Sequence, residues 1–230
     1  MNREFSFEII PKLALTFLPF LKVTLLTLLL ALIFGTIIAT VLVKLRLSKR
    51  KSLNIIAYTY IAAIRCTPAV ILIFIVFYGL PFLLQLIGID IIAFPRIFFI
   101  TVALSISFSA TFSEVMRTSY LAVNKGQTEA AIALGLSGFQ AFYRIVLPQA
   151  FVYALPNFGN SLIMLFKETS LAYTIGVVDL MGKMNLYISY KHGRNGLEAY
   201  ITVGLIYWVF VLLFERIFTL LDKKNSRGLR

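Results

Sequence analysis

The sequence predicts an all-α membrane protein with about five transmembrane helices, and its composition, its long apolar runs and its charge distribution all indicate that class. Hydrophobic residues fill 60% of the 230 positions, and the mean hydropathy is +0.89. An ordinary soluble domain is about 45–50% apolar. This chain therefore has too few polar residues to cover a globular surface, and the excess must face lipid. We expect residues 1–230 to form a single membrane domain.

Five uncharged runs supply the predicted spans. A helix that crosses about 30 Å of hydrocarbon needs about 20 residues. In chain order the runs are Val23–Val43, Cys66–Ile89, Ile97–Ser113, Ile145–Phe166 and Ala199–Phe214. The first run is longer than the apolar core of a signal peptide, which has about 7–15 residues, and basic residues follow it. We therefore expect it to be retained as a span.

The start of the second predicted helix is ambiguous, whereas a proline marks the start of the fourth. The apolar segment Ser52–Ile64 precedes the second run, and only Arg65 interrupts the two. Its 13 residues are too few to cross a membrane. We therefore expect one tilted or kinked helix over about 53–80. Pro148 suits the first turn of the fourth helix, where its missing amide hydrogen costs nothing.

The basic residues predict the orientation of the chain. The formal net charge is +12, but Lys and Arg lie mainly between the apolar runs, as in membrane proteins, which argues against nucleic-acid binding. One side of the predicted spans carries 13 of them, in 44–51, in 117–144 and from Arg216 onwards, and the other side carries eight. The positive-inside rule then places the N-terminus outside and the C-terminus in the cytoplasm. The difference is moderate, because the outer segment 183–194 is itself basic.

Several kinds of chemistry are excluded by what the sequence lacks. Cys66 and His192 are the only residues of their types, so neither an internal disulfide nor a Cys/His zinc site is expected. The chain also lacks the Gly-rich phosphate-binding loop of nucleotide hydrolases. We expect no cofactor, no metal and no catalysis by this chain alone.

The cytoplasmic connection over 117–144 is predicted to have a structure of its own. Residues 127–136 form an Ala-rich helical pattern with Gly135 near its end as a stop signal. Ser137 stands three residues before Gln140, which is the spacing of a capping box at the start of a second helix. The sequence thus predicts a helix, a tight turn and a second helix, and structured loops of this length are usually functional.

The same connection carries a motif that resembles a known family. Its residues are Glu129, Ala130, Ala131, Gly135, Ile145, Leu147 and Pro148. Their spacing resembles the EAA motif, the cytoplasmic signature of ABC importer permeases. Two further elements, Arg65–Cys66–Thr67–Pro68 and Lys167–Glu168–Thr169–Ser170–Leu171, resemble the branch that carries polar amino acids. The resemblance covers about residues 54–221.

This resemblance implies a fold, a location and a set of partners. It implies the MetI-like fold of such permeases in the cytoplasmic membrane of a bacterium. The partners are a soluble ABC ATPase in two copies, an extracellular or periplasmic amino-acid-binding protein, and a second permease subunit that is identical or similar. Residues 117–148 would be the cytoplasmic coupling loop that docks on the ATPase. Small alanines allow a close approach there, Gly135 permits a sharp turn, and Glu129 is favoured near a helix start.

Four ionisable residues lie within or at the ends of predicted spans. They are Arg65, Glu114, Lys167 and Glu168. Charges inside a membrane cost about 2.5 kcal/mol or more and tend to mark a pathway. Glu114 or Glu168 could accept the ammonium of an amino acid, and Arg65 or Lys167 could bind its carboxylate. The alternative is that these groups pair with each other, cap helices or extend to the membrane interface.

The rival function is a membrane scaffold or passive channel outside the ABC class. A pore would show a repeated filter or a ring-forming charge motif, and the sequence shows neither. The transported amino acid stays open at this point, since cystine, glutamine, arginine and histidine all suit the family.

Overall fold

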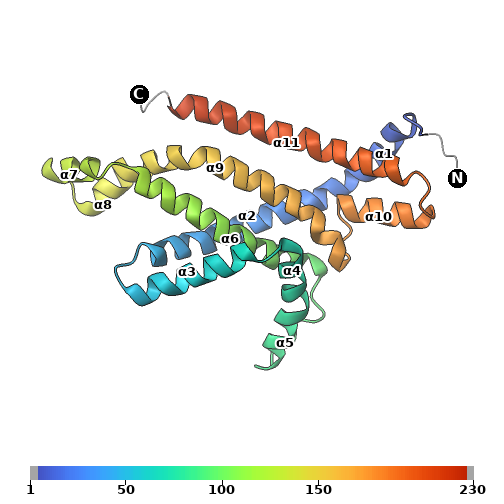
Figure 1. Cartoon of the computed structure of the whole chain (residues 1–230), viewed down its shortest axis with the longest axis horizontal. Coiled ribbons are helices and arrows are strands. Elements are labelled where there is room, and N and C mark those ends of the chain that lie inside the picture. The colour runs from blue at the N-terminus through green and yellow to red at the C-terminus, as the bar shows by residue number, and fades with distance from the viewer. Residues whose placement is uncertain (1–4, 227–230) are drawn as a thin grey trace.

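The computed structural model describes residues 5–226, and most of them lie in helices (Figure 1). The α-helices are α1 (Ile9–Phe17), α2 (Leu21–Arg46), α3 (Lys51–Cys66), α4 (Ala69–Phe74), α5 (Leu80–Gln85), α6 (Arg96–Ala122), α7 (Lys125–Ala133), α8 (Gly138–Ala141), α9 (Leu147–Glu168), α10 (Leu180–Tyr190) and α11 (Gly196–Ser226). The 3-10 segments are Leu18–Phe20 and Thr169–Ile175, and the π-helical segments are Ile75–Gly79 and Phe142–Val146. The all-α prediction is confirmed. Arg3, Arg227 and Arg230, which entered the charge count, lie outside the described residues.

The described helices provide up to five membrane spans. Three are long and apolar enough by themselves: Ile9–Arg46, Arg96–Ala122 and Gly196–Lys224. Two bent pairs bring the number to five if each pair is one span: Lys51–Cys66 with Ala69–Gln85, and Gly138–Ile175 with Leu180–Tyr190. The prediction of about five spans is therefore confirmed.

The second span differs from the single helix that the sequence predicted over 53–80. α3 ends at Cys66, and the axis turns by 110° before α4 continues from Ala69. Pro68 has no amide hydrogen to continue the helix, and its ring pushes the preceding residue towards extended backbone. Thr67 accordingly has φ −92° and ψ 126°. The helix that we expected to be tilted or kinked is thus fully interrupted after Cys66, and α4 and α5 project from the bundle (Figure 1).

Helix α6 forms the centre of the bundle. In its most apolar stretch of 18 residues, 61% are buried, compared with 28% in the corresponding stretch of α11. Helices α2, α3, α4 and α9 pack against it. Gly35 of α2 makes one of these contacts possible, because a Cβ atom there would lie 2.8 Å from Cδ1 of Phe108. A larger residue would push α2 and α6 apart.

A buried carboxylate fastens α10 to α2. Asp179 is 1% exposed and precedes the first residue of α10, where its side chain accepts a hydrogen bond from the Gly182 amide at 2.8 Å. Its other oxygen accepts a bond from the Thr24 hydroxyl of α2 at 3.4 Å. That hydroxyl in turn accepts a bond from the Leu180 amide at 3.3 Å. Asp179 is thus an N-cap whose burial is compensated by hydrogen bonds.

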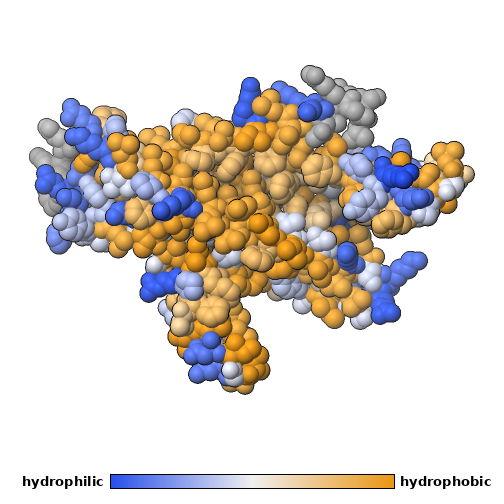
Figure 2. Space-filling view, turned by 180° about the vertical axis from the view of Figure 1, so that it is seen from behind, coloured by the Kyte–Doolittle hydropathy of each residue, from blue (hydrophilic) through white to orange (hydrophobic). Residues whose placement is uncertain are grey.

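The surface has an apolar middle and polar ends. In Figure 2, hydrophobic residues cover most of the middle of the visible face, and hydrophilic residues gather mainly towards its two ends. Large side chains such as Phe34, Ile37, Trp208 and Leu212 remain exposed along α2 and α11, as expected for helices that face lipid. The hairpin of α7 and α8 lies at one end, and α10 with the start of α11 lies at the other (Figure 1).

Candidate functional site

The turn between α7 and α8 has the backbone geometry that the sequence predicted. α7 ends at Ala133, and Gly135 follows with φ +89°, in the left-handed region. The Leu136 amide donates to the Ala131 carbonyl at 3.1 Å, and the Gly135 amide donates to the Ile132 carbonyl at 2.9 Å. This pair of hydrogen bonds is a Schellman motif, which satisfies the last carbonyls of a helix.

The second short helix starts with the predicted capping box. The Ser137 side chain accepts a hydrogen bond from the Gln140 amide at 3.2 Å, and the Gln140 side chain accepts one from the Ser137 amide at 2.9 Å. The start of α7 is capped as well, because Asn124 accepts a bond from the Gly126 amide at 2.8 Å. Both short helices therefore have fixed ends, and the hairpin is a defined structure.

The hairpin presents apolar side chains that the sequence analysis did not select. Leu134 is 83% exposed and Phe139 is 73% exposed, on either side of the Gly135 turn. Of the predicted residues, Glu129 and Ala130 are exposed, whereas Ala131 is buried. Exposed large hydrophobic residues at the tip of a polar loop are typical of a docking surface. Leu134 stands directly before the turn glycine, and that position was the signal that could have identified it.

A continuous helical segment connects this hairpin to the fourth span. α8 passes through the π-helical residues Phe142–Val146 into α9 without a break. The π turn comes just before Pro148, which lies in the first turn of α9 as predicted. Pro148 cannot donate a backbone hydrogen bond, and the shifted hydrogen-bond register accommodates it. Ile145 and Leu147 therefore lie on a stiff connection between the hairpin and the membrane.

Glu114 pairs with two arginines. Its carboxylate lies 2.7 Å from a terminal nitrogen of Arg117 and 3.5 Å from Nε of Arg46. Arg46 ends α2 and also exchanges hydrogen bonds with Asn54 of α3. Glu114 thus belongs to a charged cluster that joins α2, α3 and α6 at one end of the bundle.

Glu168 has a different environment. It ends α9, and Ser107 of α6 donates a hydrogen bond to its carboxylate at 3.3 Å. Among the side chains that the structure describes, no Lys or Arg forms an ion pair with it. A shallow groove between α6 and α9 runs past Glu168, and the hydroxyls of Ser107, Thr111 and Ser161 line it. Apolar side chains, Phe108, Met164 and Leu165, complete its lining.

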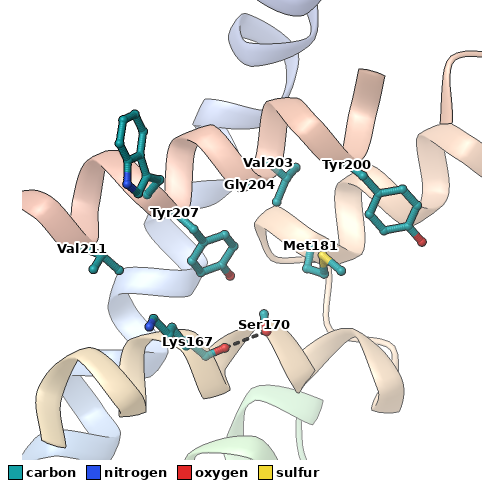
Figure 3. A pocket seen from close by; sticks show the side chains of 9 residues that line it. Lys167, Ser170, Met181, Tyr200, Val203, Gly204, Tyr207 and Val211 are labelled. Atoms are coloured by element: carbon teal, nitrogen blue, oxygen red, sulfur yellow. Dashed lines mark hydrogen bonds between the residues drawn. The ribbon is translucent and has the colours of Figure 1, made fainter. Parts of the chain in front are cut away.

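Lys167, the neighbour of Glu168, lines a second cavity. This cavity has a volume of about 480 Å³ and lies between the end of α9, α10 and α11 (Figure 3). Apart from Lys167 and Ser170, aromatic and aliphatic side chains of α10 and α11 form most of its wall, including Met181, Tyr207 and Trp208. Lys167 and Glu168 therefore line different cavities.

The four predicted charges are thus distributed over separate places. Glu114 lies in the arginine cluster, Glu168 in the groove between α6 and α9, and Lys167 in the larger cavity. Arg65 is exposed in the last turn of α3, beside the break in the second span. Within the described residues, no group of three His, Cys, Asp or Glu side chains could hold a metal ion.

Comparisons with known proteins match nearly the whole chain. The sequence model of the family described as "Binding-protein-dependent transport system inner membrane component" matches residues 31–227. The L-cystine transport system permease protein TcyL of Bacillus subtilis (strain 168) is 40% identical over 99% of this chain and 95% of its own length. The arginine transport system permease protein ArtQ of the same organism is 36% identical over 97% of this chain and 98% of its own length.

A solved structure shares the fold. A chain of an amino acid ABC transporter crystallised with histidines superposes with a TM-score of 0.83 and is 29% identical. The superposition covers 96% of this chain and all of the other.

Proposed function

This chain belongs to the family of binding-protein-dependent transport system inner membrane components, and from that premise we propose that it is the permease subunit of an ATP-driven importer for a polar amino acid. It resides in the cytoplasmic membrane of a bacterium. It works there with a soluble ATPase subunit, an amino-acid-binding protein and a second permease subunit. Family membership argues against a scaffold or passive channel. ATP is hydrolysed by the partner subunit, and this chain catalyses no reaction itself.

L-cystine is the first substrate to test. The relative with 40% identity over almost the whole chain is an L-cystine permease, whereas the arginine permease is 36% identical. The two sequence identities are too close to choose between cystine and arginine. We therefore propose only the class of substrate, the polar amino acids. Arginine, glutamine and histidine are the comparison substrates.

The observation that carries this function is the α7–α8 hairpin. The motif residues Glu129–Ala131 and Gly135 fall on a short helix and its Schellman turn, and two exposed apolar side chains flank that turn. We assign 117–148 as the coupling loop and expect Leu134 and Phe139 to enter a cleft on the ATPase. Burying a side chain of this size in a partner contributes about 1.5–3 kcal/mol.

The proposed orientation follows from the same assignment. If the hairpin meets the ATPase, its end of the molecule is cytoplasmic, and so are the loop between α2 and α3 and the end of α11. The opposite end, with α1 and α10, then faces outside. This agrees with the excess of Lys and Arg predicted for the cytoplasmic side.

Reconstitution with the partner subunits tests the function directly. The chain is co-expressed with the ATPase and any second permease subunit, purified and placed in proteoliposomes. We expect ATP hydrolysis that rises when the loaded binding protein is added outside, and uptake of radiolabelled L-cystine or another polar amino acid. Uptake down a gradient without ATP would instead indicate a passive channel.

Within the membrane, we assign the substrate ammonium to Glu168. Its partner in the described structure is the Ser107 hydroxyl, and the groove beside it carries further hydroxyls. A carboxylate in a membrane without a cationic partner is costly, and a substrate ammonium would compensate its charge. Glu114 already has two arginines, so we assign it a structural role. Lys167 and Arg65, the candidates for binding the substrate carboxylate, do not line this groove, so we assign neither of them to a site shared with Glu168.

Replacing Glu168 by Gln tests this assignment. The change keeps the shape and removes the charge, so we expect the KM for uptake to rise roughly ten- to hundred-fold, the equivalent of one charge-assisted hydrogen bond. Glu114→Gln is the matched control, and we expect it to lower thermal stability with little effect on KM. An unchanged KM in Glu168→Gln would show that this carboxylate does not contact substrate.

A further inference from the structure

The end of the molecule opposite the hairpin exposes more basic than acidic side chains among the described residues. Five basic residues belong to it, and we call them the outer basic surface: Lys12, Lys22, Lys183, Lys191 and Arg194. They come from the first helices and from α10 with the turn after it, and α10 packs against α1 and the 3-10 segment Leu18–Phe20. The ammonium of Lys183 lies 5.0 Å from the ring centre of Phe20. The two parts of the surface are therefore held side by side.

The acidic residues of these elements are largely withdrawn from the surface. Asp179 and Glu198 are 1% and 6% exposed. Asp179 caps α10, and one oxygen of Glu198 accepts a hydrogen bond from the Ser6 amide at 3.4 Å. Among the acids that the structure describes in residues 5–22 and 179–198, Glu8 alone is exposed. The charge that the described residues expose at this end is therefore mainly positive.

The turn that carries two of the cations is rigid. His192, Gly193 and Asn195 all have positive φ, at 49°, 78° and 58°. The Gly193 amide donates to the Ile188 carbonyl at 2.9 Å, and the Arg194 amide donates to the Lys191 carbonyl at 2.9 Å. A turn closed in this way fixes the backbone from which Lys191 and Arg194 extend before any partner arrives, so little backbone entropy is lost on binding.

Membrane topology does not explain these cations. Segments outside the cytoplasmic membrane usually contain few Lys and Arg residues, because basic residues favour the cytoplasmic side. The other outer connection, over 86–95, fits that tendency, since it is apolar and its one charge is Asp90. The basic residues on α10 and in the turn after it depart from this tendency. Long-range attraction between opposite charges speeds the encounter with a soluble partner, which suits a protein that delivers cargo repeatedly.

We propose that the outer basic surface docks an acidic face of the soluble amino-acid-binding protein. The inference rests on the proposed function, which supplies the partner and puts this end outside. Lys191 and Arg194 are the central residues, because they lie in the rigid turn and are exposed. Lys183 contributes from the adjoining helix.

The test uses the complete transporter in nanodiscs of neutral phosphatidylcholine. ATP hydrolysis is measured against the concentration of the loaded binding protein that stimulates the wild type. We expect the charge reversal Lys191→Glu with Arg194→Glu to raise the half-stimulating concentration about tenfold or more. Added salt should raise it in the wild type and have much less effect in the variant.

Matched controls separate this proposal from its alternatives. The double variant Lys49→Glu with Lys51→Glu makes the same change in charge at exposed positions between α2 and α3. We expect its half-stimulating concentration to equal that of the wild type. An unchanged concentration in the Lys191/Arg194 variant would overturn the proposal. So would an effect that appears only in nanodiscs with anionic phosphatidylglycerol, since the surface would then bind lipid headgroups. A wild type that no binding protein stimulates would contradict the proposed function itself.

Discussion

The two ends of the molecule are built on the same backbone turn, but the second turn adds exposed cations that the first lacks. α7 ends in a Schellman motif with Gly135 in the left-handed region, and α10 ends in one with His192 in that region. Around the first turn, the exposed side chains are the apolar Leu134 and Phe139. Around the second, they include Lys191 and Arg194. A rigid turn thus carries either kind of recognition surface.

The difference between the ends suits two kinds of partner. Apolar side chains gain free energy only on contact and when they fit a cavity, so they favour a partner that remains bound. Charges act over about 10 Å at ordinary salt concentrations and speed association, so they favour a partner that arrives and leaves. In our proposals the ATPase is the first kind, and the binding protein is the second.

The largest effect is expected from a change in the first turn. Valine at Gly135 would have to adopt φ near +89°, which costs a β-branched residue about 1–3 kcal/mol in strain. We expect Gly135→Val to insert normally but to lose stimulated ATP hydrolysis and uptake, because the hairpin no longer fits the ATPase. Gly135→Ala should cause a partial loss. Membrane levels, ATP hydrolysis and uptake are measured in proteoliposomes.

Gly138→Val is the control for that change. Gly138 lies in the same hairpin, has open space around it and lacks the positive φ of Gly135. The Gly138→Val variant should retain most of the stimulated ATP hydrolysis and uptake. If both variants transport alike, the turn geometry is not needed for coupling, and the functional assignment loses its main structural support.

A smaller effect is expected when the side chains change and the turn does not. Leu134→Glu should weaken retention of the ATPase about ten- to hundred-fold, because it removes about 1.5–3 kcal/mol of apolar burial. Leu186→Glu makes the same change on an exposed residue of α10 at the other end. It should leave ATPase binding unchanged. Binding of purified ATPase to the permease in nanodiscs measures both, and equal loss would contradict the contrast between the ends.

The features that could be predicted from sequence are those that depend on neighbouring residues. The capping box of Ser137 and Gln140 and the glycine turn at Gly135 are local patterns, and the structure confirms both. Apolar runs likewise predicted the number of spans. A tilted or kinked helix was expected over 53–80, but the angle of 110° at its break depends on how α4 packs against α6 and could not be inferred.

The distribution of the intramembrane charges could not be predicted for a related reason. Glu114 pairs with Arg46, which lies 68 positions earlier, so the pairing depends on the packing of α2 against α6. Lys167 and Glu168 are adjacent in the chain but line different cavities. Residue type showed that these charges needed partners, whereas the fold determines which partner each can reach.

The smallest effect is expected from exchanging the residue type of the second turn. A residue with a side chain pays about 1–2 kcal/mol for left-handed backbone, and glycine avoids this cost but loses about 0.5–1 kcal/mol in chain entropy. His192→Gly should therefore stabilise the protein by at most about 1 kcal/mol, a rise of roughly 1–4 °C in the unfolding temperature in detergent. Ser189→Gly, within exposed helix, should lower it instead. If both variants lose stability equally, the backbone at His192 stores no strain, and the two turns are not equivalent.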